Sequence, residues 1–227
     1  MKNVLFISAH PDDHITSAGF LLKLKEKGCQ LDEIVLTSGT GGYKHAKEKN
    51  TIAIVREQEF KRAEKLLGMK KTYLLKYDEH ELAMNRENVE AVVKIARSCK
   101  PEIIIMPNHD DYHETHIETN RIATKAIRTA IKKRKMELGQ PISPAIVLEW
   151  EYSILKQPDI IIDITSKWPL KEKLLGCYPS QITPTEKQKL KSLNMYRGAH
   201  IGVAYAEGFS INRFLPLRLD TALKLKS

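Results

Sequence analysis

The residues best suited to chemistry form two clusters that lie far apart in the chain. The first, Ala9-His10-Pro11-Asp12-Asp13, directly follows a short apolar run that is typical of a strand buried on both faces. The second, over residues 107–116, is rich in histidine and aspartate and follows another apolar run. Crowding imidazoles and carboxylates together is costly unless a cation neutralises them, and a divalent metal is the simplest one. The two clusters therefore predict a metal centre.

The residue types favour a hydrolytic metal site. A catalytic zinc typically has three ligands from His, Asp or Glu and one position open to water. His10, Asp13 and one of the two histidines His113 and His116 supply such a set, while the other histidine remains as an acid or electrostatic group. Asp12 is left to accept a proton from metal-activated water. Zinc and other divalent ions both suit this set, which is not selective by affinity.

The elements that must position these side chains alternate between strands and helices. Apolar runs predict strands over 3–8, 31–37, 71–75, 102–106, 145–152 and 160–164. Helical spacing predicts helices over 15–27, 52–67, 87–98, 114–135, 167–176 and 185–197. The pattern predicts one α/β domain over residues 1–227: a Rossmann-like three-layer sandwich with helices on both faces of a mostly parallel sheet of order 3-2-1-4-5. In that order strands one and four are neighbours, so the two clusters meet at the carboxyl edge.

Composition narrows the class of protein. The chain has 227 residues, is 42% hydrophobic and carries a formal net charge of +9. We interpret this charge as a solvated basic surface that mildly favours an anionic substrate, because no aromatic stacking pattern supports nucleic-acid binding. Three dispersed cysteines indicate a reducing, cytoplasmic setting, and no apolar stretch approaches the ~20 residues of a transmembrane helix.

Several motifs resemble those of the LmbE-like, or PIG-L-like, family of zinc-dependent N-acetylglucosaminyl deacetylases. The segment 9–13 is similar to its first motif, and Asp111-x-His113-x-x-His116 is similar to its second. Weaker similarities are Arg56-x-x-Glu59 and the segments 178–181 and 202–209. The resemblance therefore extends over essentially the whole chain and is most specific at the two metal motifs.

The resemblance implies removal of an N-acetyl group from an N-acetylglucosamine-type sugar or its conjugate. It implies that zinc is bound by His10, Asp13 and His116. It implies that Asp12 is the general base, that His113 is the general acid or a stabilising imidazolium, and that Arg56 contacts a hydroxyl or phosphate of the substrate. From the C-terminal segment, Tyr205 is a further candidate for substrate contact.

The sequence also departs from the family pattern at two positions. His14 stands where a glutamate is common, and either competes for metal or caps a helix. Thr115 stands where an aspartate orients the acid histidine, and we expect Asp111 or Asp110 to take over that role. The loop 39–42 either borders the substrate or simply needs positive φ angles.

Two other functions remain as alternatives. One is a sugar-binding or structural homologue that has lost catalysis, which the altered second motif favours. The other is a basic nucleic-acid-binding α/β protein, which the acidic metal cluster opposes because it repels phosphates. The expected partner is a small N-acetylated amino sugar rather than nucleic acid, and assembly into a homo-oligomer is left open.

Overall fold

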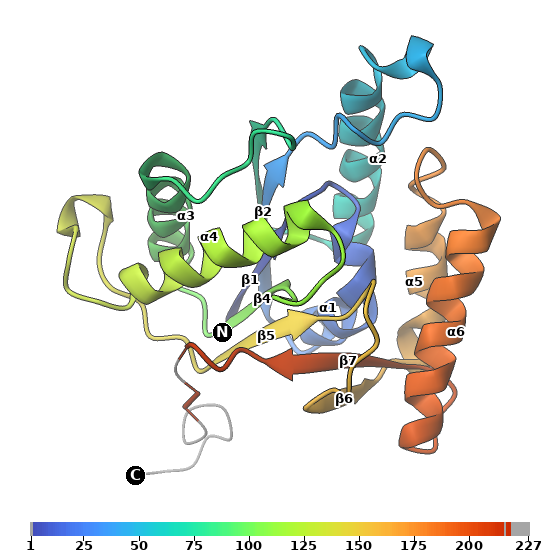
Figure 1. The fold of residues 1–227 in the computed structure, drawn as a ribbon. Coiled ribbons are helices and arrows are strands. Elements are labelled where there is room, and N and C mark those ends of the chain that lie inside the picture. Colours follow the sequence, from blue (N-terminus) through green and yellow to red (C-terminus); the bar gives the residue numbers. More distant parts are fainter. Residues whose placement is uncertain (1, 216, 219–227) are drawn as a thin grey trace.

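Seven strands form one sheet in the computed structural model, which describes residues 2–215 and 217–218 (Figure 1). The strands are β1 (Asn3–Ser8), β2 (Gln30–Thr37), β3 (Lys71–Tyr77), β4 (Ile103–Pro107), β5 (Ile146–Trp150), β6 (Ile160–Asp163) and β7 (Ala206–Ile211). Their order is β3-β2-β1-β4-β5-β7-β6. The first five are parallel, and β7 is antiparallel to both of its neighbours. The predicted order 3-2-1-4-5 is confirmed.

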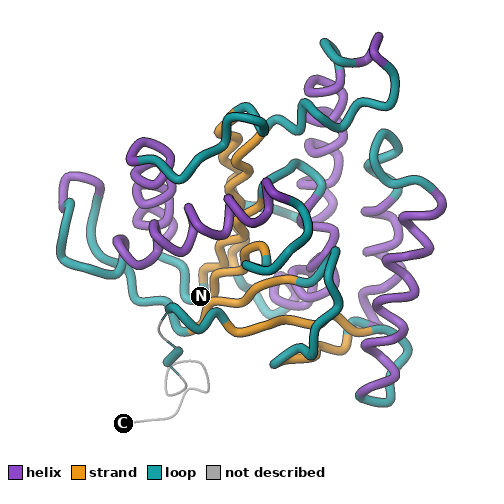
Figure 2. Tube along the Cα trace, in the orientation of Figure 1, coloured by secondary structure: helices purple, strands orange, loops and turns teal. Residues whose placement is uncertain are grey.

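Helices cover both faces of this sheet (Figure 2). They are α1 (Ala18–Glu26), α2 (Ile52–Leu67), α3 (Arg86–Cys99), α4 (Glu114–Ala130), α5 (Trp168–Leu175) and α6 (Pro184–His200). Alternate residues of β1 enter two cores: Val4 and Phe6 pack with side chains of α1, α2 and α5, whereas Leu5 and Ile7 pack with α3 and α4. This period of two gives the three-layer α/β sandwich that the apolar runs predict.

The predicted helix over 114–135 is too long. Helix α4 ends at Ala130 because the buried guanidinium of Arg97 gathers the backbone that follows. Arg97 donates hydrogen bonds to six carbonyls between Thr129 and Gly139. These carbonyls turn toward one side chain, which a continued helix does not allow.

Two further local differences lie next to the motifs. The first helix begins as a 3-10 turn, Asp13–Ser17, before α1, so the residues of the first cluster follow β1 in a tight turn. A strand that the sequence analysis did not predict lies in the C-terminal segment: residues 206–211 form β7, which lies between β5 and β6. No described helix has the length and apolar character that crossing a membrane requires.

Candidate metal centre and active-site cavity

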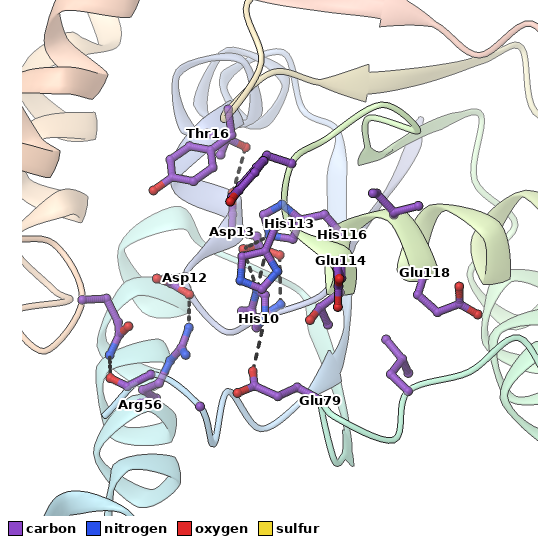
Figure 3. Close-up of a pocket in the computed structure, with 18 of the residues that line it drawn as sticks. His10, Asp12, Asp13, Thr16, Arg56, Glu79, His113, Glu114, His116 and Glu118 are labelled. Atoms are coloured by element: carbon purple, nitrogen blue, oxygen red, sulfur yellow. Dashed lines mark hydrogen bonds and ion pairs between the residues drawn. The ribbon is translucent and has the colours of Figure 1, made fainter. Parts of the chain in front are cut away.

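The two polar clusters meet where β1 and β4 end. These strands pair in parallel, with Val4 opposite Ile103, so the turns that follow them emerge side by side. His10 comes from the turn after β1, and His116 lies in the first turn of α4. Both line a cavity of about 1150 Å³ (Figure 3). The sheet order thus accounts for the meeting of residues that are distant in sequence.

Three ligand atoms form a nearly equilateral triangle. His10 Nδ1 lies 3.2 Å from His116 Nε2 and 3.4 Å from Asp13 Oδ1, and the last two atoms are 3.3 Å apart. Tetrahedral zinc with bonds of about 2.0–2.1 Å separates its ligand atoms by roughly 3.3 Å. All three residues are buried. The site therefore fits a divalent ion with one face toward the cavity.

Asp13 is fixed so that one oxygen is free for a cation. Its Oδ2 accepts hydrogen bonds from the backbone amides of Ala9 (2.8 Å) and His10 (2.9 Å). Burial alone raises the pKa of the Asp13 carboxyl, but His116 and His10 outweigh burial and hold the pKa well below its usual range. The backbone thus orients the carboxylate, and its Oδ1 remains charged beside the two imidazoles.

Asp111 supports His116 from behind. Its Oδ2 lies 3.2 Å from His116 Nδ1, and its Oδ1 accepts the backbone N–H of His113 at 2.9 Å. Burial lowers the pKa of His116, but Asp13 and Asp111 outweigh it and raise the pKa to about 10. A carboxylate on the second nitrogen of a ligating histidine is the usual support for a metal ligand. Asp111 thus contacts His116 rather than the His113 imidazole, while Asp110 pairs with Lys156 on the surface.

Asp12 and Arg56 form a pair at the wall of the cavity. Arg56 Nη2 donates to Asp12 Oδ1, and Nη1 donates to the Gly39 carbonyl at 3.0 Å. The guanidinium is buried, so its charge fixes the carboxylate beside the ligand triangle. Arg56 therefore both contacts Asp12 and lines the cavity.

The loop over 39–42 is both a cavity border and a site that requires glycine. Gly41 and Gly42 line the cavity, and the Gly42 carbonyl accepts a hydrogen bond from Gln181 Nε2 at 2.9 Å. Gly39 has a φ of 65°, and a Cβ there would lie 2.3 Å from Arg56 Nη1. The two interpretations of this loop are therefore compatible.

His113 lines the cavity between the other groups but is less constrained. Its ring centroid lies 4.8 Å from those of His10 and His116. Burial and the charges of those two histidines lower the pKa of His113. Among the described residues no carboxylate contacts its ring within ion-pair distance, and Thr115 lines the cavity nearby. The orienting carboxylate that we expected for His113 is therefore not found in Asp111.

Glu79 is a site residue that the sequence analysis missed. It follows β3, and its Oε2 lies 3.4 Å from His10 Nε2. Burial raises the pKa of Glu79, but His10, a backbone hydrogen bond from Gly41 and Arg56 outweigh it and lower the pKa. The sequence contained a signal for Glu79, because the polar run Asp78-Glu79-His80 follows the carboxyl end of a predicted parallel strand, where ligands bind.

His14 lies outside the triangle of ligand atoms. It is fully buried, with Nδ1 2.9 Å from Glu33 Oε2 and Nε2 2.7 Å from the Tyr178 hydroxyl. The same hydroxyl donates to the Pro11 carbonyl at 2.8 Å. This chain of hydrogen bonds anchors the turn that carries His10, Asp12 and Asp13.

Tyr205 lies away from the cavity. Its ring stacks on Trp168, with centroids 4.2 Å apart, and it is absent from the described cavity lining. The neighbouring Glu207 instead accepts the backbone amides of Gly19 and Phe20 at the start of α1, each at 2.8 Å. Lys171 Nζ lies 2.7 Å from Glu207 Oε1, and both side chains are buried. The C-terminal segment thus supports the fold beneath the site.

Comparison with known proteins shows the family of this chain. The family model PIG-L, described as GlcNAc-PI de-N-acetylase, matches residues 5–127, which is more than half of the chain. The chain belongs to the PIG-L family. This match includes both metal clusters and Arg56.

Two relatives and one solved structure resemble most of the chain. Diacetylchitobiose deacetylase of Thermococcus kodakarensis is 26% identical over 227 residues, covering 95% of this chain and 84% of that protein. A probable N-acetyl-alpha-D-glucosaminyl L-malate deacetylase 2 of Bacillus cereus is 25% identical, covering 79% and 84%. The structure of N,N'-diacetylchitobiose deacetylase from Pyrococcus horikoshii has a TM-score of 0.84 at 28% identity, covering 98% of this chain and 88% of that one.

Proposed function

We propose that this PIG-L family protein is a metal-dependent hydrolase that removes the N-acetyl group from an N-acetylglucosamine-type amino sugar. The observation that carries the proposal is the triangle of His10 Nδ1, Asp13 Oδ1 and His116 Nε2 at the cavity, with sides of 3.2–3.4 Å. Relatives named as deacetylases of diacetylchitobiose and of an N-acetylglucosaminyl malate support the choice of an acetylated sugar.

Each proposed role follows from a side chain in the cavity. A divalent ion such as zinc, bound by His10, Asp13 and His116, supplies Lewis acidity for an acetyl carbonyl and lowers the pKa of a water. Asp12 takes the proton of the attacking water at its second carboxylate oxygen, because Arg56 occupies Oδ1.

We assign proton donation to the leaving amine to His113. Desolvation in the cavity and the neighbouring histidines lower its pKa, so protonated His113 is a stronger acid than a histidine with the ordinary pKa. Hydrolysis then yields acetate and the free amino sugar. The lowered pKa also means that less of the protonated form is present at neutral pH, and we expect the rate to fall as pH rises for that reason.

The proposal is tested by acetate release from a panel of N-acetylated sugars, measured with the metal-loaded protein. A chelator should abolish release and added zinc should restore it. Asp12→Asn should lower kcat by about 10²–10⁴-fold while retaining metal, because the base is lost and the ligands are not. No release from any acetylated sugar by the metal-loaded protein, or release that survives Asp12→Asn, would contradict this function.

A further inference from the structure

The cavity is acidic although the molecule is basic. Its described lining includes two arginines, Arg56 and Arg121, and no lysine. Six carboxylates line it: Asp12, Asp13, Glu79, Glu114, Glu118 and Glu186. The chain as a whole has a formal net charge of +9, so the charge of the cavity lining is opposite in sign to that of the rest of the molecule. A divalent ion would reduce the negative charge of the lining without cancelling it.

Only some of these carboxylates are compensated locally. Arg56 donates to Asp12, and Arg121 Nη1 lies 3.2 Å from Glu118 Oε2. Glu186 accepts a hydrogen bond from the Tyr152 hydroxyl at 3.2 Å and lies 3.9 Å from Lys189. An incoming ligand therefore meets an electrostatic field that attracts cations and repels anions.

Glu114 is the carboxylate most available to a ligand. It is the first residue of α4, two positions before His116, and its side chain is exposed in the cavity wall. Within the described part of the chain it has no ion-pair or hydrogen-bonding side-chain partner. Glu118 lies one helical turn farther on the same side of α4. Figure 3 shows Glu114 beside His116 and Glu118 beyond it.

We propose that this cavity selects N-acetylated amino sugars that are neutral or carry a free ammonium group, and that it disfavours phosphorylated or carboxylated conjugates. The inference rests on the proposed function and defines its substrate class. It reverses the expectation drawn from the net charge, because a ligand inside a cavity responds mainly to the charges that line it. A sugar oligomer that has already lost one acetyl group then remains a substrate, since its new ammonium group faces carboxylates.

The test compares kcat/KM for three probes: N,N'-diacetylchitobiose, its singly deacetylated form and N-acetylglucosamine 6-phosphate. We expect the phosphorylated probe to be at least about tenfold poorer than the other two. Glu114→Gln should shift the ratio of cationic to anionic probe about fivefold toward the anion. One unit charge at about 8 Å in a water-like dielectric changes kcat/KM by roughly 2.3-fold, downward for the cationic probe and upward for the anionic probe, so their ratio changes about fivefold.

Glu137→Gln is the matched control, because it makes the same change in net charge. Glu137 is exposed and lies beyond the C-terminal end of α4, whereas the cavity lies at its N-terminal end. The control should leave the ratio unchanged. Equal or faster turnover of the phosphorylated probe, or the same ratio in Glu114→Gln and Glu137→Gln, would overturn the inference while acetate release still supports the proposed function.

Absence of turnover with all three probes would instead contradict the proposed function. Calorimetric binding of glucosamine and glucosamine 6-phosphate to the same two variants then decides the inference. If the ratio of the two affinities shifts toward glucosamine 6-phosphate in Glu114→Gln but not in Glu137→Gln, selection by charge is supported. Identical affinity ratios in the two variants contradict it.

Discussion

Replacing Asp111 by asparagine should weaken metal binding although Asp111 is not a ligand. The asparagine oxygen can still accept the His113 amide, which Asp111 Oδ1 accepts at 2.9 Å. Its NH₂ group then faces His116 Nδ1, which lies 3.2 Å from Asp111 Oδ2. Because NH₂ can only donate, His116 is driven to carry its proton on Nε2, the nitrogen that belongs to the ligand triangle.

The size of the effect follows from the support that Asp111 gives. Loss of a carboxylate behind a ligating histidine typically costs 10–100-fold in metal affinity, or about 1.4–2.8 kcal/mol. We expect the upper part of this range, because the Asp111 side chain is only 1% exposed and water cannot readily replace it. The unfolding temperature with metal present should fall accordingly.

The assay is competition for zinc between the protein and a chromophoric chelator. Asp110→Asn is the control, because Asp110 is the neighbouring aspartate and pairs with Lys156 on the surface. It should bind zinc like the unmodified protein. A dissociation constant for Asp111→Asn within twofold of that control, in a correctly folded protein, would refute the assigned support of His116.

Three other predictions concern the site and the buried contacts that support it. Apparent zinc affinity should increase at least about tenfold per pH unit between pH 7 and 9 in a non-chelating buffer, because zinc must displace a proton from His116, whose pKa is about 10, and the pKa of His10 is also raised; an affinity independent of pH would contradict this. Lys171→Met should lower the free energy of unfolding by about 3–5 kcal/mol in denaturant titrations, because it leaves Glu207 buried without its cation; adding Glu207→Gln should recover part of the loss, and an unchanged stability in the single variant would be the opposite result. Tyr178→Phe should lower kcat more than it changes KM, because it removes the hydroxyl that holds the Pro11 carbonyl; a change in KM alone in steady-state kinetics would show that Tyr178 does not position the turn.

Much of the site could be predicted because the carboxyl ends of parallel strands lie at the same edge of the sheet. The apolar runs before His10 and before the second cluster identify two strands, and the common order of such sheets makes them neighbours. The structure confirms that order, and its pairing of β1 with β4 brings His10, Asp13 and His116 together. Residue types and strand periodicity were sufficient to bring the two clusters together, whereas the choice of His116 over His113 came from the family resemblance.

Other features depend on contacts that spacing does not encode. The strand β7 reads as a polar and glycine-containing segment, and its placement follows from Glu207 capping α1 and pairing with buried Lys171. The early end of α4 depends on Arg97, which lies on another helix. Which group Asp111 supports depends on the direction of its side chain.

The proposed mechanism requires that His10, Asp13 and His116 share one ion. The most direct measurement is a crystal structure of the metal-loaded protein with diffraction recorded at the zinc absorption edge. We predict a single anomalous peak about 2.0–2.1 Å from His10 Nδ1, Asp13 Oδ1 and His116 Nε2. A peak held by other residues, or no peak at a protein that nevertheless releases acetate, would contradict the account.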